Sequence, residues 1–180
     1  MLKKLIALAS LAASFSFAPL AHAQANPTAT QLSHIQIGGG FSYARTDYGQ
    51  RGDKGLTIYG DYDIGVHWGA EANFHYTSIA TPNNISENSF TIGPRFILRK
   101  YHFLLYGKGV IGLGHIDAPL TPVNRLAANE TDFLIGGGGG LEYLIGRHIM
   151  LRPVDVEYQR WSFKTGLSPL VLTAGAAYHF

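Results

Sequence analysis

The sequence has 180 residues, of which only 14% are charged, and its formal net charge is +2. This near-neutral composition, without a run of basic residues, argues against a nucleic-acid-binding protein. The chain has no Cys, which excludes a disulfide framework and a thiolate metal site, whereas it has 22 Gly, 10 Phe, 10 Tyr and 2 Trp. No segment beyond the N-terminal region is a continuous apolar helix, so any contact with a membrane has to come from alternating strands.

The N-terminal residues have the pattern of a secretory signal. Lys3 and Lys4 form a basic start, residues 5–17 are mostly apolar, and residues 21–23 read Ala-His-Ala. The apolar run is shorter than the roughly 20 residues that a membrane-spanning helix needs, which argues against an uncleaved anchor. We therefore predict a signal peptide over residues 1–23, cleaved between Ala23 and Gln24, followed by a polar leader over residues 24–32 and one β domain over residues 33–180.

From residue 33 onward, apolar residues recur at every second position, which is the pattern of strands with one apolar face. In the first strand, for example, Ile35 and Ile37 alternate with Gln36. The pattern predicts eight strands, over residues 33–45, 56–64, 68–77, 90–98, 103–115, 131–145, 149–160 and 166–180.

Proline and glycine residues interrupt three of these strands. Pro94 lacks a backbone donor, so we expect a bulge or a kink at Gly93-Pro94. The apolar parity shifts near Arg152-Pro153, where we expect a second bulge. The glycine run over residues 136–140 lacks the Lys-Ser/Thr pair of a phosphate-binding loop, so we interpret it as a source of curvature and close packing.

The connections between the predicted strands alternate in length. Eight strands joined by alternating short turns and long loops form an up-and-down antiparallel meander. If its apolar faces meet lipid and its other faces line a packed lumen, the meander is a transmembrane β-barrel. The short turns follow the second, fourth and sixth strands, and the long loops cover residues 46–54, 80–88, 116–130 and 161–167.

Parity places charged side chains of both signs inside such a barrel, which is narrow enough for side chains to fill. Because a buried charge is costly unless it is paired, we predict a network of ion pairs and hydrogen bonds that plugs the lumen. The charged members of this predicted network are Glu71, Arg95, Lys108, Glu142, Asp155 and Glu157. The other inward polar side chains are Gln36, Tyr59, Asn73, His75, Tyr106, Gln159 and Thr173.

The outward face carries almost no charge across the strand centres. The absence of outward charge is favourable in a bilayer, because Lys or Arg at the bilayer midplane costs roughly 2–4 kcal/mol. Aromatic residues gather near the predicted strand ends, as interfacial girdles do. They are Trp68, Tyr76, Tyr101, Tyr158, Trp161, Phe163 and Tyr178.

The last strand ends on Tyr178 and Phe180, with apolar residues at every second position before them. This ending resembles the recognition signal of bacterial outer-membrane β-barrels. Together with the signal peptide, the strand rhythm and the glycine-rich residues 107–114, it makes the mature chain similar to the OmpA/OmpX-type, opacity-protein-like family of outer-membrane barrels.

The resemblance implies an all-β protein, an eight-stranded antiparallel up-and-down transmembrane β-barrel in a Gram-negative-type outer membrane. Residues 24–32 would then be a periplasmic leader, and the long loops would lie outside. The resemblance also implies contact with outer-membrane lipid and lipopolysaccharide, and recognition of Tyr178 and Phe180 by the barrel-assembly machinery. We expect a monomer with no cofactor, metal site or enzymatic activity, in a structural or surface-interaction role through loops whose ligands the sequence does not name.

Two other functions and one other architecture remain as alternatives. The first function is that of a lipid A-modifying, deacylase-like enzyme using His75 and Ser78, although alternation puts these residues on opposite faces. The second is that of a small low-conductance pore. The architectural alternative is a water-soluble, lipocalin-like barrel, in which the apolar face would point inward.

Two further motifs carry little weight. Arg51-Gly52-Asp53, in a predicted outer loop, spells the integrin-recognition tripeptide, but three common residues in a glycine-rich loop arise easily by chance. The histidines form no close H-x-H or H-x-x-x-H pair, so the sequence predicts no dedicated metal site.

Overall fold

The computed structural model describes residues 34–46, 52–80, 85–118, 128–162 and 167–180. The predicted signal peptide, its cleavage site at Ala23-Gln24 and the leader lie outside these ranges. No helix within the ranges is long and apolar enough to cross a membrane. The strands are β1 (His34–Arg45), β2 (Asp53–Asp63), β3 (Trp68–Ala80), β4 (Ser86–Lys100), β5 (Phe103–Ala118), β6 (Ala128–Ile145), β7 (Ile149–Trp161) and β8 (Leu170–His179).

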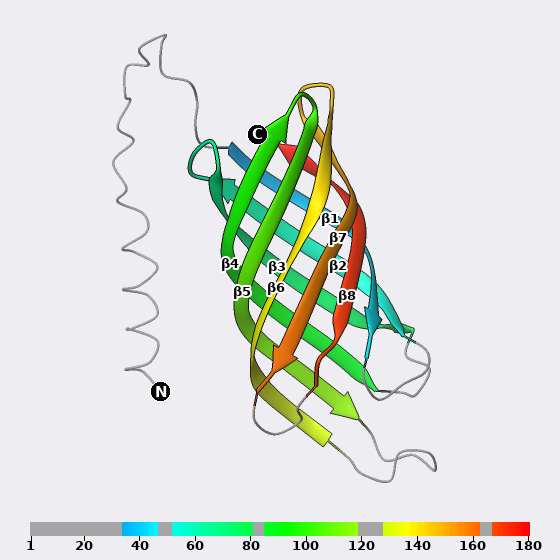
Figure 1. Cartoon of the computed structure of the whole chain (residues 1–180). Coiled ribbons are helices and arrows are strands. Elements are labelled where there is room, and N and C mark those ends of the chain that lie inside the picture. The colour runs from blue at the N-terminus through cyan, green and yellow to red at the C-terminus, as the bar shows by residue number, and fades with distance from the viewer. Residues whose placement is uncertain (1–33, 47–51, 81–84, 119–127, 163–166) are drawn as a thin grey trace, which may run out of the picture. The chain divides into compact units, whose positions relative to one another are not determined.

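Each strand pairs antiparallel with the next one in sequence, and β8 pairs with β1 to close the barrel (Figure 1). In this closing pair Phe41 lies opposite Ala174, and the register runs unbroken from Gln36 to Arg45. Closure leaves no edge strand, so the backbone groups of the wall bond to neighbouring strands, as lipid requires. The predicted eight-stranded antiparallel up-and-down barrel is confirmed.

β2 to β7 reach further toward the long loops than the apolar pattern predicts, whereas β8 begins at Leu170, four residues after the predicted start at residue 166. β2 begins at Asp53 instead of residue 56, and β5 and β6 remain paired as far as Ala118 opposite Ala128. Ladder hydrogen bonds continue beyond the apolar alternation because backbone pairing does not depend on apolar side chains. The connections are therefore shorter than the predicted loops over residues 46–54, 80–88 and 116–130.

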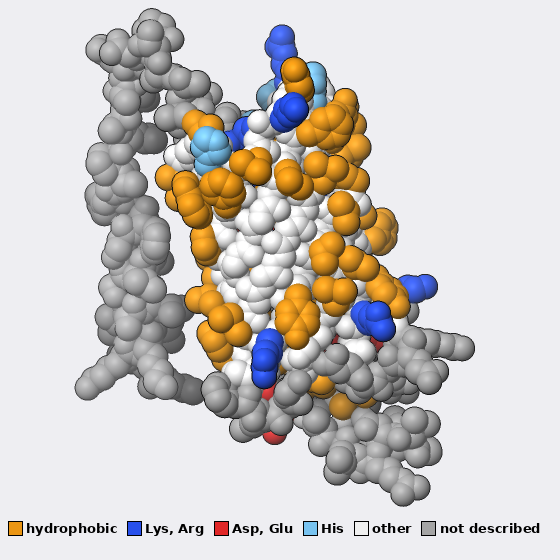
Figure 2. Space-filling model, in the orientation of Figure 1, with side chains coloured by type: hydrophobic (Ala, Val, Ile, Leu, Met, Phe, Trp, Pro, Cys, Tyr) orange, Lys and Arg blue, Asp and Glu red, His pale blue; other side chains and the backbone are white. Residues whose placement is uncertain are grey.

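The outward side chains of the wall are apolar and the inward ones are largely polar. Phe41 and Ile58 expose 78% and 62% of their surface, whereas Arg95 exposes none and Lys108 only 6%. Figure 2 shows hydrophobic side chains spread over the visible wall, with Lys and Arg side chains toward its two ends. A water-soluble barrel requires the opposite arrangement, so the lipocalin-like alternative is wrong.

A β-bulge in β7 changes which of its residues face the lumen. The register with β8 shifts between Arg152 and Asp155, as predicted near Pro153. Pro153 and Val154 are consecutive exposed residues, while Arg152 and Asp155 on either side of them are both buried. The bulge therefore turns a basic and an acidic side chain of the same strand into the interior.

The bulge expected at Gly93-Pro94 is absent. Pairing with β5 lapses at these two residues, but Ile92 lies opposite Ile111 and Arg95 opposite Lys108, which is the same register on both sides. β4 also keeps one register with β3 through this point. The missing proline donor is thus accommodated by a local gap in one ladder, without an extra residue in the strand.

The inward glycines of β6 allow side chains from its two neighbours to meet across it. Gly138 lies between Lys108 of β5 and Glu157 of β7, and Gly140 lies between Tyr106 and Asp155. A Cβ atom on Gly140 would lie 2.5 Å from the Tyr106 hydroxyl and 2.6 Å from the Val154 carbonyl oxygen. The glycine run thus makes room for the polar interior.

We expect Gly140→Ala to lower the free energy of unfolding by about 1–3 kcal/mol, because the added methyl group would displace the Tyr106 ring or the β7 backbone. Gly109→Ala is the matched control in β5, since a Cβ atom there meets nothing within 4 Å. Urea titration of the heat-modifiable folded band on a gel measures both variants. Equal midpoints for the two would contradict this role of the glycine run.

Candidate functional site

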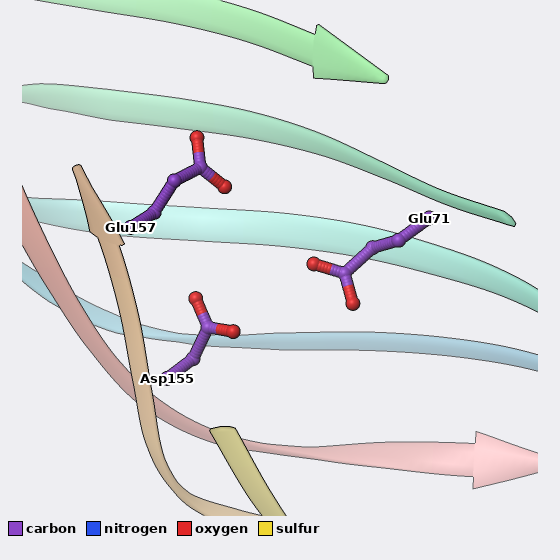
Figure 3. Close-up of side chains that lie close together, drawn as sticks. All are labelled: Glu71, Asp155 and Glu157. Carbon is purple, nitrogen blue, oxygen red and sulfur yellow. The ribbon is translucent and has the colours of Figure 1, made fainter. Parts of the chain in front are cut away.

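Lys108 lies at the centre of three buried carboxylates. Its Nζ atom is 2.6 Å from Glu71 Oε1, 3.0 Å from Asp155 Oδ1 and 2.9 Å from Glu157 Oε2. Figure 3 shows these three carboxylates pointing toward one another, Glu71 from β3 and the other two from β7. An ammonium group has three N–H donors, so each donor of Lys108 can bond to one carboxylate.

The same three carboxylates form the one group within the described ranges whose donor oxygens, all within 4.8 Å of one another, could hold a metal ion. The Lys108 ammonium already lies within ion-pair distance of all three residues. A second cation in the same space would be repelled by it. In this chain the group therefore functions as the counter-ion set of a lysine.

Two arginines form the second half of the network. Arg95 contacts Asp61 at 2.8 Å and Glu142 at 3.0 Å, and Arg152 contacts the same two carboxylates at 2.7 Å and 2.6 Å. Glu71 also lies 3.4 Å from Arg95 and 3.3 Å from Arg152, in addition to its bond with Lys108. Glu71 therefore joins the lysine and the arginine clusters into one continuous network.

Two tyrosines cover the arginines. The guanidinium carbon of Arg152 lies 3.6 Å from the centre of the Tyr59 ring, and that of Arg95 lies 4.4 Å from the centre of the Tyr106 ring. Tyr106 also donates a hydrogen bond to Asp155. Stacking on an aromatic face leaves the planar edge of a guanidinium free for carboxylates. Each arginine is thus bonded at its edge and packed on its face.

Toward the long loops the network becomes neutral and then apolar. Asn73 donates to Glu71 at 2.8 Å, and the Gln159 amide donates to Glu157 at 2.9 Å. Trp161 Nε1 donates to Gln159 Oε1 at 3.1 Å, and its ring packs with Ile116 and Leu134. Trp161 was predicted in the outward aromatic girdle, which is wrong: it is 2% exposed and closes the polar interior from within.

The structure places all six charged residues of the predicted network in the interior: Glu71, Arg95, Lys108, Glu142, Asp155 and Glu157. Sequence reasoning missed Arg152, the second arginine, and Asp61, which contacts both arginines. Asp61 shares the parity of Tyr59 in β2, so alternation could have found it. Arg152 could not be assigned in this way, because the β7 bulge interrupts the alternation beside it.

The residues weighed as a catalytic pair do not meet. His75 is 1% exposed, with Nδ1 2.8 Å from Thr57 Oγ1 and Nε2 3.4 Å from Glu157 Oε1. Ser78 donates to Asn88 Oδ1 at 2.9 Å. An imidazole held by partners in the lumen cannot reach a lipid substrate on the outer wall, so this pair offers no deacylase geometry.

The integrin-like tripeptide does not form an exposed loop motif as a whole. Asp53 is the first residue of β2 and only 3% exposed, and the Gly52 amide donates to the Tyr43 hydroxyl at 3.2 Å. Arg51 lies outside the described residues. Recognition by an integrin-type receptor would need an accessible Asp carboxylate, which this position does not supply.

At the C-terminal end, the predicted assembly-signal residues lie on the outer surface. Tyr178 and Phe180 are 46% and 66% exposed, with ring centres 4.9 Å apart. The Phe180 amide donates to the Ile35 carbonyl at 2.9 Å, which extends the contact between the chain end and β1. Both aromatic side chains are therefore accessible from outside the barrel.

A closed barrel with an apolar outer wall and a polar, charged interior defines the class of integral membrane β-barrel proteins. Residues 7–180 match the family model described as the outer membrane protein beta-barrel domain. The chain belongs to this family and is a multi-pass β-strand protein of the outer membrane.

Solved structures show the same fold at low sequence identity. OprG from Pseudomonas aeruginosa is 15% identical, with 83% of this chain and 96% of that chain covered and a TM-score of 0.62. Neisserial surface protein A is 14% identical, with 82% and 97% covered and a TM-score of 0.59. The attachment invasion locus protein Ail of Yersinia pestis, in complex with a heparin analogue, is 20% identical, with 83% and 99% covered and a TM-score of 0.56. A search of curated protein sequences finds no match.

Lys108→Met keeps most of the side-chain length but removes the charge that three carboxylates share. We expect the free energy of unfolding to fall by about 3–5 kcal/mol, because breaking a buried ion pair leaves uncompensated charge. Urea titration of the folded band measures the change.

Lys100→Met is the matched control, since Lys100 is exposed at the end of β4. Its effect should stay within about 0.5 kcal/mol, as for most surface substitutions. Equal stability of the two variants would show that the Lys108 contacts contribute nothing.

Proposed function

We propose that this protein is a non-enzymatic outer-membrane barrel with a structural or surface-interaction role, whose lumen is plugged by the ionic network. The observation that carries the proposal is the complete burial of charged side chains in the middle of the lumen: Arg95, Glu142 and Glu157 each expose 0% of their surface. A water-filled path beside these groups would give them accessible surface.

The network also supports a rigid scaffold. Arg152 on β7 bonds across the lumen to Asp61 on β2 and Glu71 on β3. Because these strands are far apart around the wall, the bonds oppose flattening and shear of the barrel. A rigid wall suits a protein whose interactions are made by the loops that it carries.

The two functional alternatives are weaker on this geometry. The small pore requires a path past Arg95 and Lys108, both of which are buried and paired with carboxylates. The deacylase-like enzyme requires His75 at the outer wall, whereas it bonds to Thr57 inside. We also propose that the protein is a monomer and that the exposed Tyr178 and Phe180 present the strand to the barrel-assembly machinery.

Planar-bilayer recording tests the plug. We expect the wild-type protein to give no stable conductance steps, and the double variant Arg95→Ala/Tyr106→Ala to give them, because it removes a guanidinium and the ring packed on it from the lumen. Arg147→Ala is the control at the barrel end, where Arg147 is exposed. Each variant is first shown to be folded by heat-modifiable migration.

Conductance steps from the wild-type protein that grow in Arg95→Ala would favour the pore over the plug. Silence of the folded double variant would show that the network is not what closes the lumen.

We further propose that residues 1–23 are removed on export and that residues 24–32 form a periplasmic leader. The Ala-His-Ala sequence before Gln24 supports this proposal. N-terminal sequencing of protein from the outer-membrane fraction should therefore begin at Gln24. A mature chain that begins at Met1 would contradict it.

A further inference from the structure

One sector of the outer wall has an uneven distribution of charge. It consists of β7, β8, β1 and β2, which are consecutive around the barrel. At the loop ends of these strands, Arg160, Arg45 and Lys54 are exposed. Within the described part of the sector, the acidic side chains are all buried on the inner face: Asp53, Asp61, Asp63, Asp155 and Glu157. The outer face of the sector therefore presents basic charge without acidic charge.

The strand register fixes the separation of the three basic residues. Arg45 lies opposite Leu170, which in turn lies opposite Tyr158, two residues before Arg160. On the other side of β1, Lys54 lies opposite Tyr43, two residues before Arg45. Three interstrand spacings, roughly 14 Å, and a register offset of four residues, roughly 13 Å, separate Arg160 from Lys54, so the three cations span about 19 Å. They form a basic rim at the loop end of this sector.

An apolar groove of about 450 Å³ lies on the same four strands. Its walls include Phe41, Tyr43, Val154 and Leu172, and Ala174 is among its small lining residues. The β7 bulge contributes to it by turning both Pro153 and Val154 outward. Lys54 also lines the groove, so the groove and the basic rim share a residue.

We propose that this groove and rim bind one phosphorylated glycolipid of the outer leaflet, with an acyl chain in the groove and its phosphate groups at Lys54, Arg45 and Arg160. The inference deepens the proposed function and rests on its orientation, with the long loops outside. Charge complementarity selects the occupant, because three cations with no carboxylate beside them on the described outer face attract a lipid with net negative charge and give a zwitterionic lipid no comparable gain.

The position of the rim fits this occupant. Basic side chains are costly at the bilayer midplane but nearly free of cost near the interface, where phosphate groups lie. Arg forms paired hydrogen bonds with phosphate, and Lys bonds to it as a point charge. The two arginines and the lysine can therefore hold a headgroup while the apolar wall below holds a chain.

Native mass spectrometry of the folded full-length protein in detergent tests the site, with bisphosphorylated lipid A as the probe. The triple variant Arg45→Gln/Lys54→Gln/Arg160→Gln should lose at least tenfold in affinity. The charge-matched control is Arg99→Gln/Lys100→Gln/Arg147→Gln, three exposed residues at the short-turn end, which should stay within twofold of wild type. Dephosphorylated lipid A should bind to wild type as weakly as the intact probe binds to the triple variant.

A second variant addresses the groove by itself. Ala174→Leu fills the groove and leaves the rim intact, so it should weaken the intact probe and the dephosphorylated probe by the same factor. If the triple variant does not fold, Ala174→Leu and the single charge reversal Lys54→Glu still test the proposal.

Unchanged affinity in the folded triple variant, or an equal loss in the charge-matched control, would overturn the proposed site. Equal binding of a zwitterionic phospholipid by wild type would also overturn it. These outcomes are independent of the bilayer recordings, because a conducting barrel can still bind lipid on its outer wall and a plugged barrel can lack such a site.

Discussion

The energetic constraint that governs this structure is the burial of charge inside a narrow barrel. Three permanent cations, Arg95, Lys108 and Arg152, lie in the lumen with little or no access to solvent. Each would be strongly unfavourable alone, so each is surrounded by carboxylates from other strands. Glu71, which contacts all three cations, makes the interior one connected unit.

The details of the wall follow from this requirement. Glycines along β6 leave the space through which Lys108 reaches Asp155 and Glu157 on β7. The bulge in β7 turns Arg152 inward beside them, and the same bulge turns Pro153 and Val154 outward, where they help to form the lipid-facing groove. One local irregularity in a strand thus shapes both the interior and the outer surface.

The inner and outer faces of the barrel are in contact with different environments. Inside, polar groups satisfy one another, and toward the loops the network ends in a bonded Trp161. Outside, apolar side chains meet lipid, and exposed basic residues are kept near the ends of the strands. This division explains how a chain with few charged residues can hold many of them in its centre and still present an apolar wall to the membrane.

Alternation by itself determined the number of strands and their antiparallel order. It also determined that residues such as Ile58 point outward and residues such as Glu71 point inward, because lipid on one face and a packed lumen on the other impose a period of two. It could not assign Arg152, because a bulge resets the phase of β7 beside it. Trp161 continues the inward parity of Gln159, and it was missed because the apolar pattern ended the strand at residue 160. Alternation also could not identify the ion-pair partners, such as Asp61 with Arg152. These depend on distances across the lumen, which exist only after β8 has paired with β1 and closed the barrel.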